Sequence, residues 1–140
     1  MSLFKQYKTD KSLEKDGRVV EFGVDEETGE KITMTIARAG GGNAAFQRVM
    51  EVALKPHRRQ IENDTIDAEV LRGIMVEVYA KTVVRDWSMV RDEGGALLDC
   101  TEDNIVYLFN LLPDLFAEVQ TIAGAMVTFR EGMLEADVKN

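Results

Sequence analysis

The sequence predicts an α+β fold, mainly α, in which an N-terminal antiparallel β-hairpin precedes a bundle of three to five helices. Apolar residues alternate with polar ones up to about residue 38, and they recur at a spacing of three and four from about residue 43. Three glycines, Gly40 to Gly42, separate the two patterns. The 140 residues suit one hydrophobic core. We therefore expect a single α+β domain over residues 17–140, preceded by a flexible N-terminal arm at 1–16.

The hairpin is expected at about 17–38. GRVVEFGV and KITMTIAR each alternate apolar and polar residues, and DEETGE connects them. DEETGE is similar to the start of a calcium loop, but its glycine comes one residue early and the terminal glutamate spacing is missing. A solvated hairpin turn is the favoured interpretation.

The helical part is expected at about 43–136. Its first helix runs from the region of Phe46 to Pro56, where the proline ends or kinks it. DAEVLRGIMVEVYAKTVVRDWSMV keeps one apolar face throughout and predicts a single long helix. Thr101 is predicted to cap the helix that follows it, and Pro113 either starts or kinks a helix. The predicted core consists of Val20, Phe22, Ile32, Met34, Ile36, Phe46, Met50, Leu71, Ile74, Val78, Trp87, Leu108, Phe116, Val119 and Ile122.

Gly40, Gly42 and Ala45 match the G-x-G-x-x-G/A spacing of a dinucleotide-binding turn. That site requires a central parallel strand before the turn and a second strand after the helix. Here the preceding strand belongs to a hairpin, and no Lys-Ser or Lys-Thr follows the glycines to make a phosphate-binding loop. The glycines are therefore interpreted as a backbone turn, with Asn43 as a cap of the next helix.

Catalytic and metal-binding patterns are weak. The chain holds one cysteine, Cys100, and one histidine, His57, in segments without a catalytic signature. No pairing of Cys and His has zinc-ligand spacing. We expect no enzymatic activity, no cofactor and no small-molecule substrate.

The chain has a formal net charge of -8, which disfavours nucleic acid as a partner. No apolar run approaches the ~20 residues of a membrane-spanning helix, and the N-terminus lacks a signal-peptide core. We therefore expect a cytoplasmic protein with no membrane partner.

Two features suggest protein-binding residues. The basic cluster of Lys55, Arg58 and Arg59 could contact an acidic partner, although cations at a helix C-terminus also complement the helix dipole. Met126 and Met133 belong to apolar stripes that are mostly core, yet methionine also makes adaptable binding surfaces. These five residues are the candidate partner-binding residues.

The order and spacing of several segments resemble the tail assembly chaperones of siphovirus-like bacteriophages and prophages. The segments are IARAGGGN, FQRVMEVALKPHRRQI, GIMVEVYAKTVVRDWSMV, LLPDLF and FREGMLEADVKN. The resemblance implies a protein of the bacterial host cytoplasm that coats the tape measure protein, delivers it to the major tail protein, and is absent from the mature virion. Self-association of many copies would suit a long client.

The resemblance also implies a longer product made by ribosomal frameshifting. The ending Val138, Lys139, Asn140 can be encoded by a slippery heptamer. The sequence is also compatible with two alternative functions. One is a structural tail component, such as a terminator or minor tail subunit, and the other is a small nucleic-acid-binding regulator that uses Lys55, Arg58 and Arg59.

Overall fold

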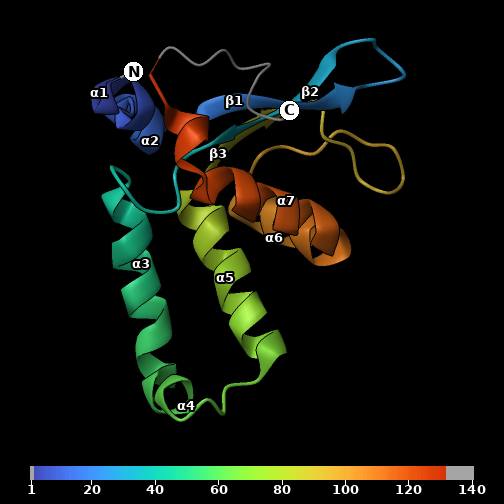
Figure 1. The fold of residues 1–140 in the computed structure, drawn as a ribbon. Coiled ribbons are helices and arrows are strands. Elements are labelled where there is room, and N and C mark those ends of the chain that lie inside the picture. The colour runs from blue at the N-terminus through green and yellow to red at the C-terminus, as the bar shows by residue number, and fades with distance from the viewer. Residues whose placement is uncertain (1, 132–140) are drawn as a thin grey trace.

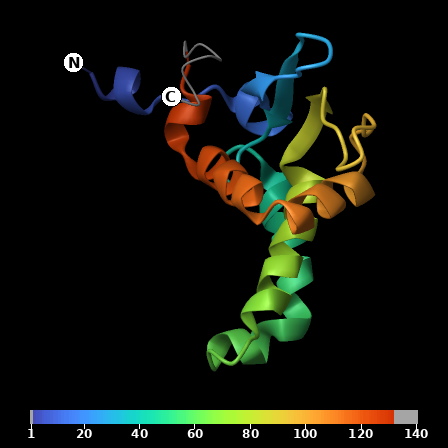
Figure 2. The same ribbon diagram turned by 90° about the vertical axis from the view of Figure 1, so that its right-hand side faces the viewer.

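A computed structural model describes residues 2–131 of the chain, and its centre is a three-stranded antiparallel sheet (Figure 1). The strands are β1 (Arg18–Val24), β2 (Lys31–Ile36) and β3 (Val84–Ser88), in the order β1-β2-β3. The longer helices lie on one side of this sheet (Figures 1 and 2). The predicted α+β class, with a β-hairpin near the N-terminus and several helices after it, is confirmed.

The other regular elements of the described chain are helices. They are α1 (Leu3–Tyr7), α2 (Lys11–Asp16), α3 (Ala44–Leu54), the 3-10 turn η1 (Lys55–His57), α4 (Arg58–Glu62), α5 (Ala68–Thr82), α6 (Glu102–Leu111), α7 (Pro113–Gly124) and the 3-10 turn η2 (Met126–Phe129). Helices α3 and α5 pack against each other as a helical hairpin that projects away from the sheet, with α4 at its tip (Figures 1 and 2). Thr101 caps α6 as predicted, since its Oγ1 accepts a hydrogen bond from Asn104 N at 3.1 Å.

Strand β3 corrects one prediction. The long helix expected to reach Val90 ends at Thr82, and the next residues pair with β2. This pairing completes a buried row across the sheet, because Val20 lies opposite Met34 and Met34 lies opposite Trp87. Tertiary pairing thus overrides a periodicity that fits a helix equally well. The predicted helical part, 43–136, is accordingly interrupted by a strand.

A β-bulge modifies the expected alternation of β1. Glu21 pairs with Thr33 and Gly23 pairs with Ile32, so that Phe22 is the extra residue. The bulge shifts the alternation by one residue, and Val24 is 58% exposed. Phe22 remains packed at the margin of the core.

Aromatic rings join the helices into one core. Tyr79 of α5 makes edge-to-face contacts with Phe46 of α3 and Phe116 of α7, at centroid distances of 5.8 and 5.3 Å. Phe116 also lies 5.1 Å from Phe109 of α6, which is fully buried. Most of the predicted core is buried; the half-buried members are Phe22, Ile32, Phe46, Met50, Leu71 and Ile74.

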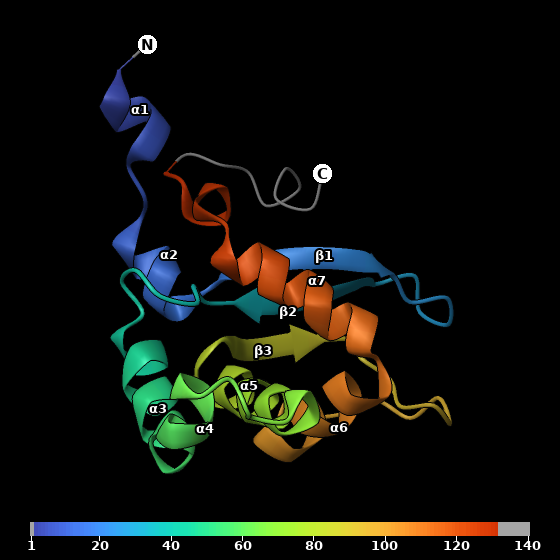
Figure 3. The ribbon, with the colours of Figure 1, turned by 60° about the horizontal axis from the view of Figure 1, so that its bottom comes forward.

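The N-terminal segment, expected as an arm over 1–16, contains two helices with different environments. Helix α2 is capped by Asp10, whose carboxylate accepts hydrogen bonds from Ser12 N and Leu13 N. The Asp10 amide donates to the carbonyl of Phe129, and α2 carries the fully buried Glu14. Helix α2 is therefore part of the packed body, whereas α1 extends beyond it (Figure 3).

The glycine turn is confirmed as a backbone turn, and it closes around Glu14. Gly41 has φ +52°, and a Cβ there would clash with the Glu14 carboxylate. Asn43 occupies the N-cap position of α3 as predicted, but its side chain makes no capping hydrogen bond. Its buried amide instead donates to the carbonyls of Arg38 and Thr82, both at 2.9 Å, and thereby ties the turn to the end of α5.

Candidate functional site

A sharp corner between α6 and α7 exposes large apolar side chains. At the end of α6, Leu112 N donates a hydrogen bond to the Leu108 carbonyl at 2.8 Å. Pro113 is the first residue of α7, which confirms the prediction that this proline starts a helix. The two helices bend by 114° at this point. Leu111 and Leu112 are 52% and 48% exposed, so the corner presents apolar surface to solvent.

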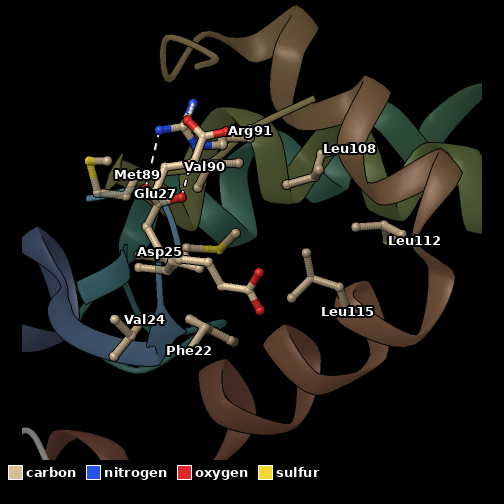
Figure 4. A pocket seen from close by; sticks show the side chains of 13 residues that line it. Phe22, Val24, Asp25, Glu27, Met89, Val90, Arg91, Leu108, Leu112 and Leu115 are labelled. Atoms are coloured by element: carbon tan, nitrogen blue, oxygen red, sulfur yellow. Dashed lines mark hydrogen bonds and ion pairs between the residues drawn. The ribbon is translucent and has the colours of Figure 1, made fainter. Parts of the chain in front are cut away.

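An open cleft lies between this corner and the β1–β2 hairpin, and we refer to it as the corner cleft. Its volume is about 490 Å³. In Figure 4, Leu108, Leu112 and Leu115 line one side, and Phe22 and Val24 line the other. The full lining is Phe22, Val24, Asp25, Glu26, Glu27, Ile32, Met34, Met89, Val90, Arg91, Leu108, Leu112 and Leu115. The walls are thus mainly aliphatic, while the charged residues come from the two loops at the rim.

An ion cluster fixes that rim. Arg91, which follows β3, makes a two-pronged contact with Asp25 of the β1–β2 loop, from Nε to Oδ1 at 2.8 Å and from Nη2 to Oδ2 at 3.2 Å. The Arg91 guanidinium, helped by a Thr28 hydrogen bond and opposed by burial, lowers the pKa of Asp25 to about 2. Glu27 adds an outer ion pair to Arg91 at 3.3 Å. Asp25 also accepts hydrogen bonds from the backbone N and the hydroxyl of Thr28 within the hairpin turn, which confirms the turn interpretation of DEETGE. The same carboxylate therefore holds the two loops together.

A second hollow continues the cleft around the end of α6. It has a volume of about 320 Å³ and shares Arg91, Leu108 and Leu112 with the corner cleft. Tyr107, Leu111, Asp92 and Glu93 complete its lining. The resulting surface is an apolar groove with an acidic border, the form that accepts one face of an amphipathic helix with cationic flanks.

The sequence-predicted partner residues lie elsewhere. Lys55, Arg58 and Arg59 are exposed at the tip of the helical hairpin, in η1 and α4. Lys55 and Arg58 line an open concavity of about 740 Å³ that Glu51 and Glu62 also line, so its charge is mixed. Such a surface lacks the concentrated positive charge of a phosphate-binding patch.

The two predicted methionines do not join that cluster. Met126 is half-buried in η2, close to the sheet end of the molecule, whereas α4 lies at the opposite end (Figure 2). Met133 and the ending at Val138 to Asn140 lie outside the described residues. The structure therefore does not assemble the sequence-predicted residues into one site.

Cys100 and His57 lie on different elements: Cys100 immediately precedes the N-cap of α6, and His57 ends η1. Burial raises the pKa of the Cys100 thiol to about 11, with a smaller contribution from Asp86, so the thiol is protonated at neutral pH. Within residues 2–131, no group of three His, Cys, Asp or Glu side chains is placed to hold a metal ion.

The described helices are shorter than the ~20 residues that a membrane-spanning helix requires. None of them alone is long and apolar enough to cross a membrane, and α6 with α7 meets that test only as a pair bent at the corner.

Sequence reasoning missed the corner cleft because its walls come from four separate segments. Sequence periodicity places Leu108 in the predicted core but does not show that it also lines a cleft. One local signal was available: Leu111 and Leu112 precede Pro113, and a proline at the start of a new helix marks a chain reversal at which apolar residues can remain exposed.

The fold and cleft together define a small α+β protein with a preformed apolar groove. The sequence model of the YdaY prophage protein family matches residues 41–140. The match covers most of the chain, including both corner helices, and the protein belongs to this family. It is thus a phage or prophage protein. No curated protein and no solved structure shows significant similarity to it.

Proposed function

We propose that this prophage protein is a tail assembly chaperone that holds apolar helical segments of the tape measure protein in the corner cleft. The observation that carries the proposal is the exposure of Leu111 and Leu112 at the 114° corner, beside a cleft of about 490 Å³. Monomeric soluble proteins rarely leave a large contiguous apolar groove uncovered unless it receives a partner. Membership of a prophage family and the resemblance of the sequence to tail assembly chaperones support the identity of that partner.

The proposed mechanism uses reversible burial and no chemical step. A tape measure helix would otherwise expose an apolar stripe in the host cytoplasm before the tail tube forms, and such surfaces aggregate. The aliphatic walls cover this stripe, and the rim held by Asp25 and Arg91 keeps the cleft open. Modest affinity for each segment lets the major tail protein replace the chaperone as the tube grows.

The test combines pull-down with a point variant in the cleft. Tagged protein is recovered from cells that co-express the neighbouring tail genes, and mass spectrometry identifies its partners and the contents of finished particles. We expect the tape measure protein in the eluate and no tagged protein in the particles. Leu112→Glu places a charge in the groove, and loss of an interface anchor costs about 2 kcal/mol, which is roughly thirtyfold in Kd.

Val52→Glu is the matched control, since Val52 is 70% exposed on α3 and lies outside the corner cleft. It should retain the tape measure protein in the eluate. Equal recovery with Leu112→Glu and the unaltered protein would disprove the role of the cleft. Presence of the protein in purified particles would instead support a structural tail component, and recovery of RNA or DNA alone would support the nucleic-acid-binding alternative.

A further inference from the structure

Helix α1 exposes large apolar side chains to solvent. Its side chains Leu3, Phe4 and Tyr7 are 72%, 79% and 62% exposed, and none of its residues is buried. A helix of five residues is far below the ~12 residues at which isolated helices become even marginal in water, so packing against another surface would stabilise it. On the C-terminal side of the helix, Thr9 bridges to Arg130 and so ties this segment to the packed body.

The charge of this segment is opposite to that of the protein as a whole. Lys5, Lys8 and Lys11 lie on or beside α1, whereas the chain has a net charge of -8. The ammonium group of Lys8 pairs with Glu131 at 3.5 Å, and both side chains are more than half exposed, so this ion pair can exchange for another at little cost. An apolar helix flanked by ammonium groups is the ligand for which the corner cleft has matching walls and rim.

The rim supplies the complementary charge. Glu26 and Glu27 border the corner cleft, and Glu93 borders the adjoining hollow. Glu27 is 70% exposed at its side chain although it pairs with Arg91, so it can also reach an incoming cation. The floor between these carboxylates is aliphatic, which suits Leu3 and Phe4.

Helix α1 and the corner cleft lie at opposite ends of the molecule. Figures 1 and 3 both place α1 at one end of the sheet, and the β1–β2 loop and the α6–α7 corner at the other. An arm at one end and its receptor at the other cannot meet within one copy without rearrangement. Contacts between copies would be head-to-tail, which generates an open chain of subunits unless the rotation closes it.

We propose that α1 of one copy docks in the corner cleft of a second copy, with Leu3 and Phe4 on the leucine wall and Lys5 and Lys8 near Glu26 and Glu27. The copies then form head-to-tail assemblies in the absence of a client. The arm covers the same surface that a client helix would occupy, so client binding displaces the arm. This displacement rests on the proposed function. The association itself does not, because it involves this chain alone.

Sedimentation velocity of the purified full chain, without client, tests the proposal. We expect the weight-average sedimentation coefficient to rise with protein concentration. Phe4→Glu and Leu112→Glu should each weaken association at least tenfold. Val52→Glu, on the projecting hairpin, should associate as the unaltered chain does. A chain that remains monomeric throughout the concentration series, or unaltered association of Phe4→Glu, would overturn the proposal.

Mixing the two variants gives a sharper test. The Phe4→Glu chain retains a normal cleft and the Leu112→Glu chain retains a normal arm, so an equal mixture should recover one arm–cleft contact and stop at a dimer. Failure of the mixture to associate, with both variants folded by circular dichroism, would contradict the head-to-tail arrangement. If Leu112→Glu does not fold, Val24→Glu replaces it, since Val24 lines the same cleft and is 58% exposed.

The outcomes separate this inference from the proposed function. Association that depends on the arm, without recovery of the tape measure protein in the pull-down, would support the assembly and refute the client. Recovery of the client by a chain that never self-associates would support the chaperone and refute the arm contact. Competition completes the test: a synthetic peptide of residues 2–11 should dissociate the assemblies, and one with Phe4→Glu should not.

Discussion

Replacing Glu14 with glutamine should remove a large pH-dependent part of the stability. Burial alone would raise the pKa of Glu14, but hydrogen bonds from Arg38 (2.6 Å), Thr9 (2.8 Å) and Gly42 N (3.3 Å), with the Lys11 ion pair, outweigh it and lower the pKa from 4.5 to about 2. At about 1.4 kcal/mol for each pKa unit, that difference corresponds to roughly 3 kcal/mol. Because the pKa is lower in the folded state, this stabilisation is complete above pH 4.5 and is lost as the pH falls towards 2.

The assay is urea denaturation followed by circular dichroism, from pH 7 down to pH 2. We expect Glu14→Gln to lower the free energy of unfolding by about 3 kcal/mol at pH 7 and the difference to shrink below pH 4.5. Glu21→Gln is the matched control, since the Glu21–Lys31 pair is exposed and should contribute less than about 1 kcal/mol. A difference below about 1 kcal/mol for Glu14→Gln at pH 7, or one independent of pH, would refute the reasoning.

Three further predictions concern stability and reactivity. Gly41→Ala should lower the free energy of unfolding, because φ +52° and the nearby Glu14 carboxylate both oppose a Cβ. Gly73→Ala, in open space within α5, should raise the free energy of unfolding by roughly 0.5–1 kcal/mol, and the midpoints of urea denaturation distinguish the two variants. Phe116→Ala should cost about 3–5 kcal/mol, measured as a lowered Tm, since the ring is 3% exposed. Alkylation of Cys100 by iodoacetamide in the folded chain should be slow at pH 7 and accelerate towards pH 11, and a rate that matches a model thiol would contradict the raised pKa.

Local patterns predicted the elements whose causes are local. The hairpin, the glycine turn, the Thr101 cap and the helix start at Pro113 all follow from neighbouring residues, and the structure confirms them. Strand β3 was not predictable in this way, because VVRDWS fits a helix or a strand and its pairing with β2 decides the outcome. Glu14 was missed for a related reason: its burial depends on Arg38 and the glycine turn, which lie far along the chain.

The corner cleft shows the same limit for the site. Periodicity identified the apolar residues of α6 and α7 but could not show which of them the 114° bend would leave uncovered. Opposite charges at Asp25 and Arg91 are 66 positions apart, and nothing in the sequence pairs them. Lys55, Arg58 and Arg59 were predicted as partner-binding residues because they lie close together in the sequence. Closeness in sequence does not show that residues form a binding site, and the structure leaves all three exposed at the tip of the helical hairpin.

The two ends of the described chain are joined, and this has a consequence for synthesis on the ribosome. Arg18 Nε donates to the Thr128 carbonyl at 2.6 Å, and the Asp10 amide donates to that of Phe129. Strand β1 and α2 therefore cannot form these bonds until the ribosome has synthesised nearly the whole domain. All of these partners precede residue 132, so this junction can form only after synthesis has passed Phe129, and the N-terminal strand and helix remain without these bonds until then.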